Sequence, residues 1–292
     1  MRGGGSGPQG AEGRRGQKAA ALQFTPELVA QGVGLLPPHG QPGGTIQASY
    51  SVKNEGLVAA GPFTTRFYLS PDGVKSAGDK RLEGAHAASG VAAGGGLSAG
   101  GIVVTVPTAV APGSYHVIAC VDDPNKIAEG NETDNCVASP GPSILIERPN
   151  LVVQAVGAPG AAVAPGGNLL VTDTTKNTGG IATLSASTTR YYLSTNQTKG
   201  SGDKLLTGGR TVPVLDAGAS SQGTAGVGVP SSTAPGPYYL LACADDSKGL
   251  AETSETDNCA ASASPVQGGV PTSSSIPSRT RPARWAPGGA SA

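Results

Sequence analysis

The chain has 292 residues, enough for two domains of ordinary size, and contains 46 glycines and 24 prolines. Its 20 lysines and arginines balance its 20 aspartates and glutamates, which excludes the basic surface that attracts nucleic acid or an anionic membrane. No apolar run is long enough for a membrane-spanning helix, and the first 24 residues lack the apolar core of a secretory signal.

The sequence repeats itself once. A shift of 123 residues aligns "PELVAQGV" at 26–33 with "PNLVVQAV", and "APGSY" at 111–115 with "APGPY". After a one-residue insertion, "TTRFYLS" at 64–70 recurs as "TTRYYLS" at 188–194. A period above a hundred residues is too long for a solenoid repeat, so it indicates a duplicated domain.

We therefore predict two domains, at 26–147 and 149–266. The flanking segments 1–25 and 267–292 are rich in Gly, Pro, Ser and Arg. Such segments cannot bury enough apolar surface to fold, and we predict that both are disordered. Between the domains, "ILIERPNLVV" at 144–153 leaves no flexible linker, which predicts a stiff connection.

Within each domain the apolar residues alternate with polar ones. In "TIQASYSVKN" (45–54), Ile46, Ala48, Tyr50 and Val52 share one face, as in a half-buried antiparallel strand. Similar β-rich runs follow at 102–106, 115–121 and 238–244. No window of a dozen residues has a helical face, so the fold class is all-β, with each domain an antiparallel β-sandwich.

Two tyrosines follow proline-glycine turns at the start of a strand. Tyr115 follows "APGS" and Tyr238 follows "APGP". In Greek-key sandwiches, a tyrosine in this position forms a corner by donating a hydrogen bond to the backbone upstream. We predict this structural role for both.

The motifs "LVVQAV", "KNTGG", "TTRYYLS", "APGPYYLLACADD" and "AETSETDNC" resemble the CARDB domain, the cell-adhesion-related domain found in bacteria. The resemblance covers both units. It implies an immunoglobulin-like sandwich of seven strands, a form often found in tandem in large exported or surface proteins. The first unit departs more from the pattern at 86–101, where its strand pairing is open.

Each unit contains two cysteines at the same spacing, and each pair flanks one turn region. We favour the disulfides Cys120–Cys136 and Cys243–Cys259, each closing the hairpin between the last two strands. The alternative is a pair of two-cysteine zinc sites, although zinc needs four ligands and all three histidines lie in the first unit. Disulfides indicate an oxidising compartment.

The segments from cysteine to cysteine are acidic, and ten of their seventeen positions, the two cysteines included, are identical. Their carboxylates could supply oxygen ligands to calcium, but the spacing is not that of an EF-hand. The favoured interpretation is that these side chains cap turns by accepting backbone hydrogen bonds. The candidate calcium ligands are Asp122, Asp123, Glu129, Glu132, Asp134, Asp245, Asp246, Glu252, Glu255 and Asp257.

One aspartate occupies an inward position. Asp173 takes the place of Tyr50 on the apolar stripe of its strand, where an unpaired charge is costly. Either the strand register differs between the units, or an arginine neutralises the carboxylate. Arg66 and Arg190 recur in the two "TTR" motifs, and Arg190 is our candidate partner.

Catalytic patterns are missing from the sequence. The second unit has no histidine, which excludes a duplicated Ser-His-Asp or Cys-His arrangement, and no phosphate-loop or zinc-protease motif is present. We predict a non-enzymatic adhesion or spacer module of a bacterial surface or secreted protein. Its partner is then an unknown protein or a carbohydrate surface ligand.

Two alternatives remain open. The domains could be accessory parts of a secreted hydrolase whose catalytic domain is absent, or calcium-dependent modules that bind carbohydrate. An extracellular location conflicts with the missing secretory signal, so we expect a misassigned start or a fragment of a longer chain.

Overall fold

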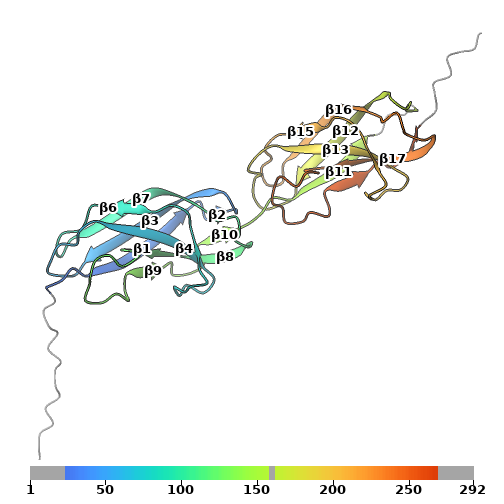
Figure 1. Cartoon of the computed structure of the whole chain (residues 1–292). Coiled ribbons are helices and arrows are strands. Elements are labelled where there is room, and N and C mark those ends of the chain that lie inside the picture. Colours follow the sequence, from blue (N-terminus) through green and yellow to red (C-terminus); the bar gives the residue numbers. More distant parts are fainter. Residues whose placement is uncertain (1–23, 158–161, 269–292) are drawn as a thin grey trace, which may run out of the picture. The chain divides into compact units, whose positions relative to one another are not determined.

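The structure is a computed structural model that describes residues 24–157 and 162–268 (Figure 1). These residues form strands, turns and loops but no helix, so the described part of the chain has no helix that could cross a membrane. The all-β prediction is confirmed. The chain divides into two compact units, and each is described by itself. The predicted disorder of 1–23 and 269–292 lies outside the described residues.

The first domain pairs two antiparallel sheets. One has the order β1-β3-β7; the other has the order β2-β10-β8-β4-β5, with β6 on β4 and β9 on β8. The strands are β1 (Leu28–Leu36), β2 (His39–Gly40), β3 (Thr45–Asn54), β4 (Phe63–Ser70), β5 (Lys80–Arg81), β6 (His86–Ala88), β7 (Gly96–Thr105), β8 (Gly113–Cys120), β9 (Cys136–Ala138) and β10 (Ile144–Ile146).

The second domain repeats this arrangement. Its sheets have the orders β11-β12-β16 and β14-β13-β17-β18, with β15 on β13 and β19 on β17. The strands are β11 (Leu151–Gly157), β12 (Asn168–Asn177), β13 (Ser187–Ser194), β14 (Lys204–Leu205), β15 (Arg210–Val212), β16 (Ser220–Gly228), β17 (Gly236–Cys243), β18 (Cys259–Ala261) and β19 (Val266–Gly268).

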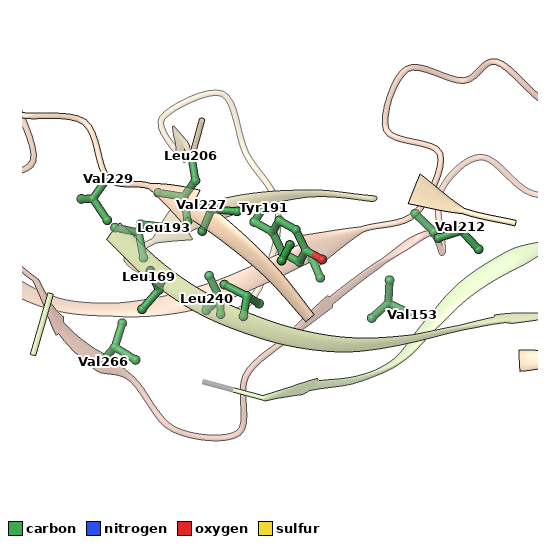
Figure 2. Packing of buried hydrophobic residues seen from close by; sticks show 14 of the residues in the cluster. Val153, Leu169, Tyr191, Leu193, Leu206, Val212, Val227, Val229, Leu240 and Val266 are labelled. Atoms are coloured by element: carbon green, nitrogen blue, oxygen red, sulfur yellow. The ribbon is translucent and has the colours of Figure 1, made fainter. Parts of the chain in front are cut away.

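The core of the second domain draws on both sheets. Val153, Leu169 and Val227 come from the β11-β12-β16 sheet, and Tyr191 and Leu240 come from the sheet that faces it (Figure 2). All five are buried. Burying one such side chain contributes about 1.5–3 kcal/mol, so an interior with few aromatic residues still holds the two sheets together. The predicted sandwich is confirmed.

Strand β3 has the predicted alternation. Ile46, Ala48, Tyr50 and Val52 are each 3% exposed or less, whereas Gln47 between them is exposed. Strand β3 pairs with β1 on one side and with β7 on the other, so it is the central strand of its sheet. Its inward face packs against the second sheet through Tyr50, which contacts Phe67 edge-on at 6.1 Å between ring centroids.

The glycine-rich segment 86–101 contains β6 and the first part of β7, with a loop at 89–95 between them and one bulge in β7. Strand β6 pairs with β4, and β7 pairs with β3 from Gly96 onward. The register shifts between Ala48 and Tyr50, opposite Gly100 and Gly101. Gly101 has a φ of 69°, a conformation that glycine adopts without steric cost. The glycines therefore accommodate an extra residue at an edge strand.

The second domain ends two residues later than we predicted. Gln267 and Gly268 belong to β19, where Gly268 pairs with Gly236 on β17. These two residues are therefore part of a sheet and not the beginning of a tail. Their contribution comes from backbone hydrogen bonds to a distant strand, which local composition does not reveal.

Both predicted tyrosine corners are present. The Tyr115 hydroxyl donates to the Ala111 carbonyl at 3.0 Å, and the Tyr238 hydroxyl donates to the Ala234 carbonyl at 3.1 Å. Each bond fixes the turn that enters β8 or β17. These are the strands that end in the first cysteine of each disulfide.

We expect Tyr238→Phe to lower the free energy of unfolding of the second domain by about 1 kcal/mol, because one hydrogen bond to a turn carbonyl is lost while the ring stays. Chemical denaturation measures the change. Tyr239→Phe is the matched control, since the Tyr239 hydroxyl makes no hydrogen bond to any described residue. Equal effects of the two substitutions would contradict the assignment.

Candidate functional site: the disulfide-bracketed loops

Two disulfides anchor the acidic loops. Cys120, the last residue of β8, lies directly opposite Cys136, the first residue of β9, and the two are bonded. Cys243 and Cys259 are bonded in the same way between β17 and β18. The structure has no free cysteine. The two-cysteine zinc alternative is therefore wrong, because all four thiols are used.

The first acidic residue of each loop caps the turn that leaves the strand. Asp122 and Asp245 have positive φ values of 46° and 39°. Their carboxylates accept the N–H groups of Ile127 and Leu250, each at 2.7 Å. Aspartate is among the residues that tolerate this backbone conformation and cap such turns. Burial raises the pKa of Asp122, and the bond from Ile127 opposes that shift.

A glutamate in each loop holds the first strand of its domain. Glu129 accepts the Leu28 N–H at 2.8 Å, and Glu252 accepts the Leu151 N–H at 2.5 Å. Glu252 also accepts the Asn258 amide at 3.0 Å and is only 4% exposed. Burial is the main reason that the pKa of each glutamate rises to about 7, and neighbouring carboxylates add to it.

The stability of both domains should therefore fall as the pH rises through this range. Below about pH 4.5 the side chain is protonated in both folded and unfolded chains. Between that value and about pH 7, the folded chain binds more protons, so the free energy of unfolding decreases with rising pH. We expect Glu252→Gln to flatten this slope in the second domain, as measured by denaturation across pH 4–8. Glu83→Gln, at an exposed glutamate, is the control; an equal flattening there would contradict the assignment.

The later acidic residues complete each loop. Glu132 accepts the Glu129 N–H at 3.0 Å, as Glu255 accepts the Glu252 N–H at 3.2 Å. Asp134 and Asp257 accept side-chain amides of asparagine at 2.7 and 3.0 Å. These carboxylates hold the loop in shape, which matches the turn-capping interpretation.

The second acidic residue faces an open space instead. In the second domain, the Tyr192 hydroxyl donates to Asp246 at 2.6 Å, and the Lys199 ammonium pairs with the same carboxylate. Lys199 also lies over the Tyr192 ring, 4.4 Å from its centroid. Burial and the bond to Asp246 raise the pKa of Tyr192. A hollow of about 510 Å³ lies here, beside the Cys243–Cys259 disulfide.

The first domain has a smaller counterpart of about 160 Å³. There Tyr68 donates to Asp123, and Lys75 lies over the Tyr68 ring at 4.1 Å. Burial, the Asp123 hydrogen bond and the Asp123 charge raise the pKa of Tyr68 to about 12. Arg66 also pairs with Asp123 at 3.5 Å. At the equivalent place in the second domain, Arg190 is exposed and makes no ion pair with any described residue.

Calcium binding by the ten carboxylates stays a prediction. Each of them accepts at least one hydrogen bond within its own domain, and the described residues contain no group of three or more His, Cys, Asp or Glu side chains arranged for a metal ion. A calcium ion would compete with these donors. Calorimetric melting with millimolar calcium and with a chelator tests the point.

Asp173 is buried, but its predicted partner was wrong. Arg210 donates to both carboxylate oxygens of Asp173, from Nε at 2.8 Å and from Nη2 at 2.5 Å. The Tyr191 hydroxyl adds a third donor at 2.5 Å, and Thr175 adds a fourth at 3.1 Å. Arg190 points outward because its neighbours in β13 occupy the inward positions.

Arg210 could not be identified from the sequence, because its strand, β15, has only three residues and is too short to show an alternation of apolar and polar residues. One signal could have found it. A shift of 124 residues places Arg210 on His86, and His86 contacts Tyr50, the residue aligned with Asp173. The pair Tyr50 and His86 of the first domain is thus replaced by the pair Asp173 and Arg210 in the second.

The comparisons with known proteins centre on one family. The family model of CARDB matches residues 25–139 and 148–262. No curated protein matches the chain.

Three solved structures are similar to parts of the chain. A CARDB domain from Pyrococcus furiosus, described as a complex with di-metal ions, is 24% identical, covers 41% of this chain and 89% of its own, and has a TM-score of 0.30. The solution structure of a CARDB domain from the same organism has 22% identity, covers 42% and 96%, and has a TM-score of 0.29. A red sea bream transglutaminase has 15% identity, covers 83% and 31%, and has a TM-score of 0.26.

Proposed function

Because the chain belongs to the CARDB family, with two tandem copies of an adhesion-related domain, we propose that it is a non-enzymatic adhesion or spacer module of a bacterial surface or secreted protein. The observation that supports this function is that both acidic loops are anchored to their own domains and serve a structural role. Glu129 and Glu252 tie each loop to the first strand of its domain, and a disulfide closes each loop.

The extracellular part of the proposal is supported by the disulfides. Structural disulfides persist in oxidising compartments and are rare in a reducing cytosol. The described polar side chains of the loops accept hydrogen bonds from backbone and amide groups, which suits an architectural role. The stiff connection between the domains stays a prediction from the sequence, and small-angle X-ray scattering tests it.

The adhesion test uses the full oxidised chain immobilised on beads. We expect the beads to bind bacterial or host cell surfaces above the level of beads carrying an unrelated β-sandwich. Reduction of the disulfides should lower that binding. No binding above the unrelated sandwich for any surface would remove the adhesion role and leave a spacer. Turnover in a panel of peptidase and glycosidase substrates would overturn the non-enzymatic assignment.

A further inference from the structure

The segment that enters the second domain, Arg148–Asn150, lies between β10 and β11 and is held by the disulfide-closed loop. The Thr253 N–H donates to the Pro149 carbonyl at 3.0 Å, and the Ser254 N–H donates to Asn150 Oδ1 at 2.8 Å. The Thr253 hydroxyl also donates to the Arg148 carbonyl at 3.4 Å. Two neighbouring loop residues therefore bond to all three residues of this entering segment.

The entering segment is also held from the side of β12, but only at its last residue. The Asn150 N–H donates to Asn177 Oδ1 at 3.1 Å, and the Thr178 N–H donates to the Asn150 carbonyl at 2.7 Å. By contrast, the Arg148 and Pro149 carbonyls accept hydrogen bonds from the loop alone among the described residues. The order of these two residues therefore depends on the loop, while Asn150 keeps its backbone bonds to the end of β12.

The first domain holds its own entering segment from the same loop positions. The N–H groups of Gly130 and Asn131 both donate to Glu27 Oε2, at 3.0 and 3.1 Å. A shift of 123 residues places Glu27 on Asn150 and these two loop residues on the pair that bonds to it. The side chain differs between the domains, yet the contact is kept. Holding the entering segment is therefore a shared property of the two loops.

The disulfide fixes the end of the loop that makes these contacts. Cys259 is the first residue of β18, which has three residues and lies at the edge of its sheet, paired with β17 alone. So short an edge strand frays readily. The disulfide joins its first residue to Cys243, directly opposite on β17. Without that bond, the part of the loop next to β18 loses its fixed end.

The core of the second domain does not include the disulfide. Neither Cys243 nor Cys259 belongs to the apolar cluster between the sheets, whereas Leu250 from the middle of the loop does. The Leu250 N–H also donates to Asp245 at 2.7 Å. The first half of the loop is thus anchored by packing and by its own turn. Reduction should loosen the loop after Leu250 and leave the two sheets together.

We propose that the Cys243–Cys259 disulfide is a redox switch for the entering segment. When the bond is intact, the loop holds Arg148 and Pro149 on the second domain; when it is reduced, these residues become mobile while the sandwich stays folded. A dithiol supplies the two electrons and two protons: its thiolate breaks the S–S bond, both cysteines become thiols, and the dithiol closes into its own disulfide. The inference goes beyond the proposed function, because it holds whether or not the module binds a surface.

The test is nitrogen-15 relaxation NMR of the full chain, which reports backbone order on the picosecond to nanosecond timescale. We expect the amide order parameters of Arg148, Thr253 and Ser254 to fall from about 0.85 in the oxidised chain to below about 0.6 after reduction by a dithiol. Those of Val171 and Leu240, which lie in the core of the two sheets, should stay at about 0.85. Reoxidation should restore the first values.

Two double variants separate the second disulfide from the first. Cys243→Ala with Cys259→Ala should make the entering segment of the second domain mobile without any reductant. Cys120→Ala with Cys136→Ala is the matched control, because it removes the equivalent bond from the first domain. It should loosen the first domain's loop and leave the entering segment of the second domain as ordered as in the oxidised wild-type chain.

Three results would overturn the proposal: unchanged order parameters at Arg148 and Thr253 without the disulfide, a change that reoxidation does not reverse, or loss of the dispersed signals of the whole second domain. The last result would make the disulfide a requirement for the fold. A variant that keeps the disulfide checks the contact itself. Asn150→Ala removes the acceptor of the Ser254 N–H and should lower the Ser254 order parameter. An unchanged value there would equally contradict the switch.

Discussion

Replacing Arg210 by methionine is expected to destabilise the second domain by about 3–5 kcal/mol, because the substitution leaves the Asp173 carboxylate buried without its cation. Asp173 is 1% exposed and lies on the inward face of β12. Arg210 donates to both of its oxygens, and the remaining donors, Tyr191 and Thr175, are neutral and cannot balance the charge of the carboxylate. Breaking one side of the pair therefore costs more than the pair itself contributes.

Denaturant unfolding of the full chain measures this effect, with the first domain as an internal reference. Arg190→Met is the matched control, since Arg190 is exposed and should change stability by no more than about 0.5 kcal/mol. An Asp173→Asn protein whose melting is unchanged across pH 4–8 would argue against the buried pair.

The first domain supplies a rescue for the same position. There Tyr50, Phe67 and His86 occupy the places of Asp173, Tyr191 and Arg210, and the Tyr50 hydroxyl lies 3.0 Å from His86 Nδ1. We expect the combined change of Asp173→Tyr, Tyr191→Phe and Arg210→His to recover most of the lost stability. The three positions are in contact, so their effects should be strongly non-additive.

Reduction of the Cys243–Cys259 disulfide is expected to lower the free energy of unfolding of the second domain by about 3 kcal/mol, the value for closing a loop of this length in the unfolded chain. That is a large share of the 5–15 kcal/mol typical of a whole domain. In the second domain this loop, residues 244–258, is the longest segment between two consecutive strands, so its order depends strongly on the disulfide.

Calorimetry with and without a thiol reductant tests this expectation. The double variant Cys243→Ala with Cys259→Ala is the control, because its melting should not respond to the reductant at the second transition. An oxidised chain that melts at the same temperature as the reduced one would contradict the stabilising role. Because the first domain has an equivalent disulfide, both transitions should move in the wild-type chain.

Local patterns carried much of the fold. The alternation in 45–54 identified β3 and its inward face, and the internal repeat located both domains. The same alternation also excludes Arg190 as an inward residue, since Thr189 and Tyr191 flank it on the buried face of β13. The alternation of buried and exposed residues in β13 therefore argues against Arg190 as the partner of Asp173, although the "TTR" motif recurs in both domains.

What local patterns could not reveal are contacts between distant segments. Glu252 accepts a hydrogen bond from the Leu151 N–H, 101 positions earlier, and nothing in the loop sequence indicates that partner. The hollow similarly needs Lys199, which reaches Asp246 from a different hairpin. Such contacts follow from which strands become neighbours, and strand order is decided by the whole core.

The position of the disulfides has a mechanical consequence for a protein that carries tension between its ends. The cysteines are 16 positions apart, and the residues between them cannot contribute to the length of a pulled chain while the bond is intact. At about 3.5 Å per extended residue, an oxidised domain that unfolds under load is roughly 50 Å shorter than the same domain with its disulfide reduced. Two such domains in series form a tether whose greatest length is set by the redox state around it.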